Sequence, residues 1–96
     1  MTKVIPLPSF IKWLNGLNDE TIKAIVAARI DRLRHGLMGD VESVGSGVLE
    51  LRIHVGAGWR VYFTRHQGDI IILLVGGSKR TQSRDIKLAK SLAERL

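Results

Sequence analysis

The apolar positions in the N-terminal third of the chain repeat with the period of an α-helix. Their spacing predicts a short helix over residues 9–16 and a longer helix from about Asn18 to His35, with Gly36 ending it. The stripe of the longer helix comprises Ile22, Ile25, Val26, Ile30 and Leu33. Residues 3–7 predict a short edge strand, because Pro6 cannot donate a hydrogen bond to a neighbouring strand. We expect the two helices to pack as a hairpin.

From Val48 onward the period changes to two, which is typical of β-strands. Residues 48–55 and 59–64 both alternate apolar and polar side chains. A three-residue turn at 56–58 would pair Val55 with Trp59, His54 with Arg60, and Arg52 with Tyr62. That register keeps the apolar faces together. Residues 37–47, rich in glycine and polar side chains, are interpreted as a linker.

The third strand is predicted at residues 70–75, an unbroken apolar run suited to the centre of a sheet. The pair Gly76-Gly77 would let the backbone bend sharply after it. A helix capped by Thr81 or Ser83 would follow, with a basic exposed side. The fold class is therefore α+β: two N-terminal helices packed on a small antiparallel sheet of three to four strands, with a C-terminal basic helix. At 96 residues, the chain is expected to form one domain over 1–96.

The net charge of +6 lies mostly in the second half of the chain. Residues 1–46 carry six Lys or Arg against five acids, whereas residues 47–96 carry nine against four. Such an excess favours binding to a polyanion such as nucleic acid, although it is also typical of a solvated helix face. The absence of cysteine excludes disulfides and thiolate metal sites. No apolar run is long enough for a membrane span or signal peptide, so we expect a cytoplasmic protein without a membrane partner.

The candidate site lies on the polar side of the predicted hairpin, where Arg52, His54, Arg60 and Tyr62 share one face. In this register Arg52 and Arg60 are diagonal neighbours rather than opposite ones, yet one ligand can reach both, and a phosphate between them would offset the repulsion of like charges. Two further cations, Lys79 and Arg80, follow the glycine pair, with Gln82 beyond; Arg84 and Lys87 lie on the exposed side of the last helix. The alternative is that Arg52 pairs with Glu50 or with an acid of a helix, and that Tyr62 is only a half-buried strand residue.

Metal chemistry receives no support from the sequence. The three histidines are scattered and have no partnered carboxylates in the sequence pattern, and no glycine-rich phosphate loop is present. We therefore expect neither a metal nor a cofactor. His54 is the best candidate for proton transfer, because the ordinary pKa of imidazole lies near neutrality.

Four segments carry a resemblance to a known family, and Trp13-Leu14 and residues 36–40 also fit it, so that the resemblance covers nearly the whole chain. The four segments are Gly47-Val-Leu-Glu-Leu-Arg-Ile, Gly56-Ala-Gly-Trp-Arg-Val-Tyr-Phe, Leu73-Leu-Val-Gly-Gly-Ser-Lys, and Gln82 with Asp85-Ile-Lys-Leu-Ala-Lys. The chain resembles addiction-module killer proteins, the phage-type HigB branch of the RelE/ParE toxins. The resemblance implies an antiparallel sheet with two packed helices. It also implies ribosome-dependent cleavage of mRNA through the substrate's own 2′-hydroxyl, without a metal.

The resemblance also implies roles for individual residues. Basic active-site positions map to Arg52, His54, Arg60 and Lys79 or Arg80, of which we assign Lys79 to catalysis. RNA contacts are expected from the remaining candidates, with Tyr62 stacking on a base. This set comprises Tyr62, Arg80, Gln82, Arg84 and Lys87. RelE proteins have a catalytic tyrosine near the C-terminus, where this chain has Ile86, so the general base stays open.

The expected partners follow from the same resemblance. They are a cognate helix-turn-helix antitoxin, the ribosome and mRNA, with DNA reached only through the antitoxin complex. Two other functions stay open. A ParE-like protein would inhibit DNA gyrase on the same fold, and a non-catalytic co-regulator would bind RNA or DNA together with its antitoxin and would not need His54.

Overall fold

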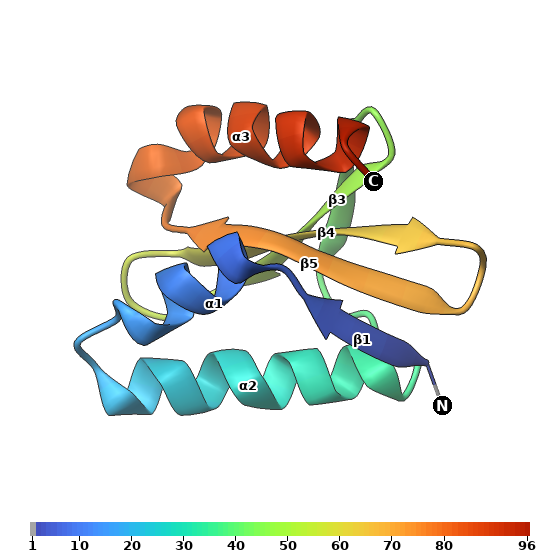
Figure 1. Ribbon diagram of the computed structural model, residues 1–96. Helices are drawn as coiled ribbons and strands as arrows, with labels where there is room; N and C mark the ends of the chain where they lie inside the picture. Colours follow the sequence, from blue (N-terminus) through green and yellow to red (C-terminus); the bar gives the residue numbers. More distant parts are fainter. Residues whose placement is uncertain (1) are drawn as a thin grey trace.

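The structure combines a five-stranded sheet with three α-helices, and the predicted α+β class is confirmed. The computed structural model describes residues 2–96 (Figure 1). The elements are β1 (Lys3–Pro6), α1 (Pro8–Asn15), α2 (Glu20–Arg34), β2 (Val41–Gly45), β3 (Val48–Ile53), β4 (Trp59–His66), β5 (Ile70–Gly77), the 3-10 turn η1 (Lys79–Thr81) and α3 (Gln82–Glu94). Within these described residues, no helix is long and apolar enough to cross a membrane.

The sheet lies between two helical layers, with α1 and α2 on one face and α3 on the other (Figure 1). Alternate side chains of β3 and β4 enter different layers. Leu51, Val61 and Phe63 pack with α1 and α2, whereas Val48 and Tyr62 pack beneath α3. The polar face predicted for the hairpin is therefore covered by α3 over part of its length.

Helix α2 begins where the sequence supplies a strong N-cap. The Asp19 side chain accepts hydrogen bonds from the backbone N–H groups of Thr21 and Ile22, at 2.9 and 3.3 Å. The buried stripe contains Ile22, Val26, Ile30 and Leu33, in agreement with the predicted periodicity. The predicted helices and the apolar stripe of α2 are thus confirmed. The expected helical hairpin is wrong, because α1 packs mainly on β5 rather than along α2.

The predicted pairing of β3 with β4 is wrong by two residues. Arg52 lies opposite Arg60, and Glu50 lies opposite Tyr62. Strand β3 ends at Ile53, so the connection to Trp59 is a five-residue loop rather than the expected three-residue turn. A shift of two residues leaves every side chain on its original face of the sheet, which is why alternation alone does not detect it.

Two further features of the sheet were not predicted. The supposed linker contains β2, an edge strand that pairs antiparallel with β3. Its register is irregular between Ser43 and Gly45, which interrupts the alternation that would reveal a strand. Strand β1 is the other edge, as expected, but pairs parallel with β5. The sheet therefore has five strands and is mixed rather than wholly antiparallel.

Gly76 and Gly77 continue β5 and do not form the predicted bend. Neither has a positive φ, so conformational freedom is not what these positions require. A Cβ atom at Gly76 would overlap the indole ring of Trp13, and one at Gly77 would overlap the carboxylate of Asp85. The two glycines let α1 and α3 approach the end of β5 from opposite faces.

Replacing Gly76 by alanine is expected to destabilise the fold by about 1–3 kcal/mol, because Trp13 must move away from the added methyl group. Urea unfolding followed by tryptophan fluorescence measures this change. Gly16→Ala is the matched control, because Gly16 has an αR backbone and its Cβ would make only ordinary contacts. Equal stability of the two variants would contradict the packing role of Gly76.

Candidate functional site

A fully buried carboxylate, that of Glu50, lies at the centre of the candidate site. Its Oε2 accepts hydrogen bonds from the Tyr62 hydroxyl and from Gln82 Nε2, both at 2.9 Å. Its Oε1 accepts one from Arg52 Nε at 3.0 Å, and Arg60 Nε lies 3.5 Å from Oε2. These groups come from β3, β4 and α3, so one side chain links three elements.

These contacts keep Glu50 ionised although it is buried. Burial alone raises the pKa of Glu50, but the hydrogen bonds from Gln82, Arg52 and Tyr62 outweigh it and hold the pKa below its ordinary 4.5. For Tyr62, burial and the neighbouring carboxylate both raise the pKa of the hydroxyl. Tyr62 is consequently a neutral donor near neutral pH and is not a base.

Arg52 is surrounded by carboxylates. Besides Glu50, its guanidinium contacts Glu42 through Nη2, and its Nη1 lies 3.9 Å from Asp40 Oδ1. The expectation that Arg52 and Arg60 need a phosphate between them is therefore wrong, because Glu50 already lies between them. The alternative reading, in which Arg52 pairs with Glu50, is confirmed. An RNA phosphate would have to compete with three acids for this side chain.

Arg60 does not project from the surface as the sequence suggested. Its side chain is only 11% exposed, and Nη1 donates a hydrogen bond of 2.6 Å to the carbonyl of Gly58. Gly58 has a positive φ of 71°, and a Cβ there would lie 3.3 Å from Lys79 Cβ. The structure thus brings Arg60 and Lys79 together at Gly58, but places Arg60 beneath the surface.

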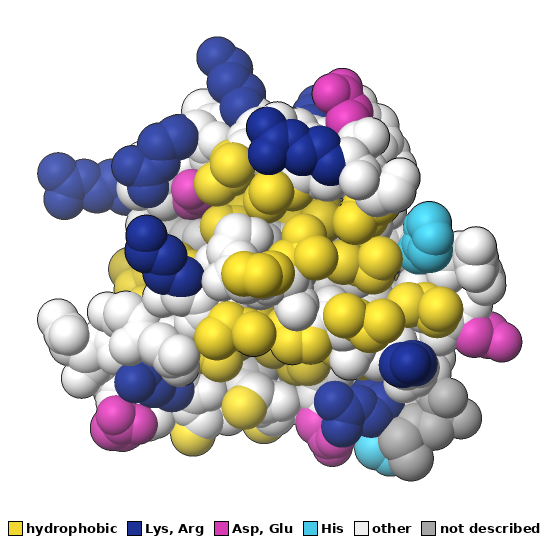
Figure 2. Space-filling model, viewed as in Figure 1, with side chains coloured by type: hydrophobic (Ala, Val, Ile, Leu, Met, Phe, Trp, Pro, Cys, Tyr) yellow, Lys and Arg dark blue, Asp and Glu magenta, His cyan; other side chains and the backbone are white. Residues whose placement is uncertain are grey.

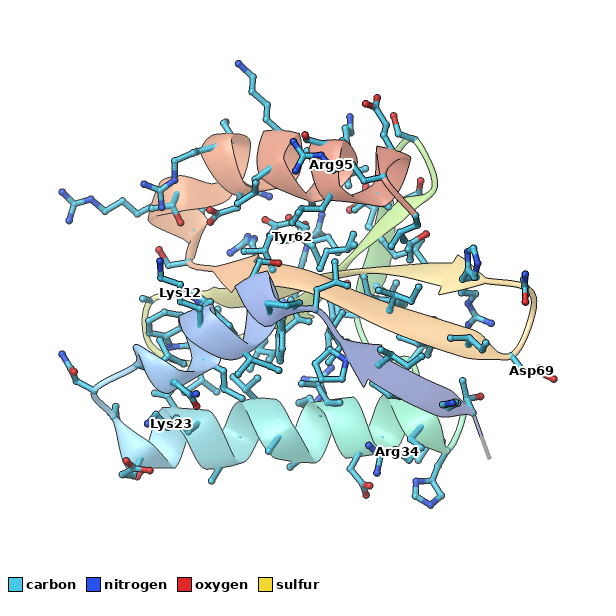
Figure 3. All side chains as sticks on the ribbon, in the orientation of Figure 1. Lys12, Lys23, Arg34, Tyr62, Asp69 and Arg95 are labelled. Atoms are coloured by element: carbon cyan, nitrogen blue, oxygen red, sulfur yellow. The ribbon has the colours of Figure 1, made fainter. Side chains whose placement is uncertain are left out.

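Tyr62 also requires a correction, because its ring is completely buried. Figure 3 shows it in the layer between the sheet and α3. A ring in this position has no free face on which a base could stack. The sequence pattern indicated at most a half-buried residue, because the cover that α3 provides comes from a segment distant in the chain.

His54 lies at the exposed end of β3 and does not face Arg60. Its side chain is 72% exposed, and Nε2 lies 2.6 Å from Asp40 Oδ2. Sequence reasoning missed Asp40, because this acid lies in the stretch interpreted as a linker. Only the recognition of β2 brings Asp40 next to the end of β3.

The remaining predicted cations form what we call the basic strip, namely Lys79, Arg80, Arg84 and Lys87. All four are exposed on η1 and the first turns of α3. Basic side chains gather at this end of α3 in Figure 2. The backbone N–H of Lys79 donates to the Ala57 carbonyl at 3.3 Å, which docks η1 on the loop that begins at His54. Gln82, predicted to contact RNA, instead points inward to Glu50.

No metal centre is evident in the part of the chain that the structure describes. Residues 2–96 contain no group of three His, Asp or Glu side chains placed to hold an ion.

Replacing Glu50 by glutamine should lower stability at pH 7 by about 1.5–3 kcal/mol, because a charged hydrogen-bond acceptor is lost. A carboxylate whose folded pKa is depressed stabilises the protein above its unfolded pKa, and that stabilisation is lost as pH falls through the folded value. The stability difference between wild type and Glu50→Gln should therefore shrink below about pH 4.5. Urea unfolding from pH 7 to 3 measures it.

The control is Glu94→Gln, which removes an exposed carboxylate at the end of α3. Its stability at pH 7 should equal that of the wild type, because an exposed carboxylate at this position has no buried contact to lose. If the stabilities of Glu50→Gln and wild type differ by the same amount at every pH, the contacts of Glu50 do not lower its pKa in the folded protein.

Comparison with known proteins shows the family to which the chain belongs. Residues 12–95 match the family described as phage derived protein Gp49-like (DUF891). An uncharacterized protein of Haemophilus influenzae is 49% identical over 88 residues, which cover 92% of this chain and 89% of that protein. The matched region contains His54, the basic strip and the Glu50 cluster, by which we mean Glu50 and the four side chains around it, Arg52, Arg60, Tyr62 and Gln82. The chain therefore belongs to the Gp49-like family of phage-derived proteins.

Proposed function

We propose that this protein is the toxin of a type II toxin-antitoxin system and inhibits translation as a ribosome-dependent mRNA endonuclease. The observation that carries the proposal is an exposed imidazole, His54, at the start of the loop on which η1, with Lys79, is docked. A titratable group and several cations near one loop suit cleavage of a phosphodiester. Membership of the Gp49-like family agrees with the resemblance to HigB-type toxins.

In the proposed reaction, the 2′-oxygen of the substrate attacks the adjacent phosphorus and the bond from phosphorus to the 5′-oxygen breaks. His54 takes the proton of the 2′-hydroxyl, and the leaving 5′-oxygen receives a proton from a general acid, either the imidazolium so formed or solvent. The products are a 2′,3′-cyclic phosphate and a 5′-hydroxyl. No oxidant, reductant or added nucleophile is needed.

The cations would have separate tasks. Lys79 and Arg80 are exposed and can approach the phosphate, where they would stabilise the charge that develops on its oxygens. Arg60 lies below them and holds the Gly58 carbonyl, so it would support the loop rather than bind RNA directly. Arg84 and Lys87 extend the positive surface along α3 toward the flanking RNA.

The proposal includes a helix-turn-helix antitoxin as partner, through which the complex would reach DNA, and a cytoplasmic site of action. A net charge of +6 favours an acidic partner surface. Neutralisation would follow if that surface covered the basic strip, because the ribosomal RNA and the mRNA would then be excluded.

Primer extension on a reporter mRNA in a cell-free translation reaction tests the proposal. Wild-type protein should cut the mRNA only when ribosomes are present. His54→Ala should lower the cleavage rate by about 10²–10⁴-fold, since a general acid or base is removed. Lys79→Ala should lower it about tenfold, which corresponds to one charge-assisted hydrogen bond.

His66→Ala is the control for His54→Ala, because His66 lies at the end of β4 away from the loop that begins at His54. Lys23→Ala, on α2, is the control for Lys79→Ala. Both should cleave like the wild type. Intact mRNA with the wild-type protein would contradict the proposal and direct the next test to DNA supercoiling by gyrase.

A further inference from the structure

Asp40 shares its two carboxylate oxygens between the two parts of the candidate site. Oδ2 lies 2.6 Å from His54 Nε2, and Oδ1 lies 3.9 Å from Arg52 Nη1. Arg52 is in turn held by Glu50 and Glu42. The exposed imidazole is therefore linked to Glu50 through Asp40 and Arg52.

The main chain fixes Asp40 in this position. Its carbonyl accepts a hydrogen bond of 2.9 Å from the N–H of Arg52, and β2 begins at the next residue, where Val41 pairs with Leu51. Gly39, with a φ of 67°, supplies the left-handed turn that leads into the strand. Asp40 thus has a fixed place relative to the end of β3, which His54 follows directly.

We propose that Asp40 is a positioning residue for His54 and sets which ring nitrogen is free to exchange a proton with RNA. This inference rests on the proposed ribonuclease function. In a neutral imidazole only one nitrogen carries hydrogen, and a carboxylate acceptor at Nε2 selects the form protonated there. Nδ1 then keeps its lone pair and is the atom that removes the 2′-hydroxyl proton.

The environment of Asp40 favours its role as a charged acceptor. The hydrogen bond from His54 and the positive charges of Arg52 and Arg29 hold the pKa of Asp40 below its ordinary value. Exposed ion pairs contribute little to folding stability. The pair between Asp40 and His54 therefore matters more for the orientation and tautomer of the ring than for holding the fold together.

The test combines a spectroscopic measurement with the cleavage assay. Two-bond ¹H–¹⁵N correlation spectra of the full-length protein, recorded well above the ordinary imidazole pKa of about 6.5, identify the tautomer of each histidine. The His54 signals are assigned by their loss in His54→Ala. Wild-type His54 should be protonated at Nε2, and Asp40→Ala should give the mixture of tautomers of a free imidazole. Asp40→Ala should also cleave mRNA about ten- to a hundredfold more slowly.

Two further variants separate positioning from general disruption. Asp40→Asn keeps an oxygen that can accept from Nε2, so it should restore the tautomer and part of the rate. Glu42 contacts Arg52 but not His54. Glu42→Gln should therefore leave the tautomer of His54 unchanged.

Two results would overturn the role proposed for Asp40. A His54 tautomer that Asp40→Ala does not alter would show that Asp40 does not select it. An altered tautomer with an unchanged cleavage rate would show that the selection has no catalytic consequence. If the wild type cleaves nothing, the proposed function fails together with the catalytic role of Asp40, and the spectra then report only whether the contact exists.

Discussion

The structure depends on the burial of one charge, the carboxylate of Glu50. Arg52 and Arg60 lie directly opposite each other on β3 and β4, a pairing that would be repulsive alone. Glu50 reaches both, and it also accepts hydrogen bonds from Tyr62 and Gln82. A buried carboxylate is costly unless its partners are present, so this cluster forms only when β3, β4 and α3 are all in place. Glu50 thereby links the register of the hairpin to the position of the last helix.

This arrangement separates the basic residues into two groups. Arg52 binds carboxylates and Arg60 binds the Gly58 carbonyl, so both side chains stabilise the packing around Glu50. The basic strip on η1 and α3 is exposed, as is His54 at the end of β3. The proposed chemistry therefore belongs to His54 and the basic strip. The Glu50 cluster holds together the strands and the helix that position these residues.

The sequence predicted the elements well and the contacts between them poorly. Helical spacing in α2 is a local property, and the structure confirms it. The strands β3 and β4 are also found, but their predicted polar face is largely buried, because α3 covers it. The hairpin register was missed because a two-residue shift preserves alternation, and β2 was missed because its irregular pairing hides the period of two. The sequence indicates Glu50 only as an alternative partner for Arg52. Its full role depends on Gln82, which lies 32 residues away in the chain.

The chemical nature of the RNA ends tests the account most directly. Attack by the 2′-oxygen, assisted by His54, leaves a 2′,3′-cyclic phosphate or the 3′-phosphate derived from it on one fragment and a 5′-hydroxyl on the other. Mass spectrometry of the fragments formed on ribosomes should find these ends. Fragments with a 3′-hydroxyl and a 5′-phosphate would contradict the account, because they require water rather than the 2′-hydroxyl as the nucleophile.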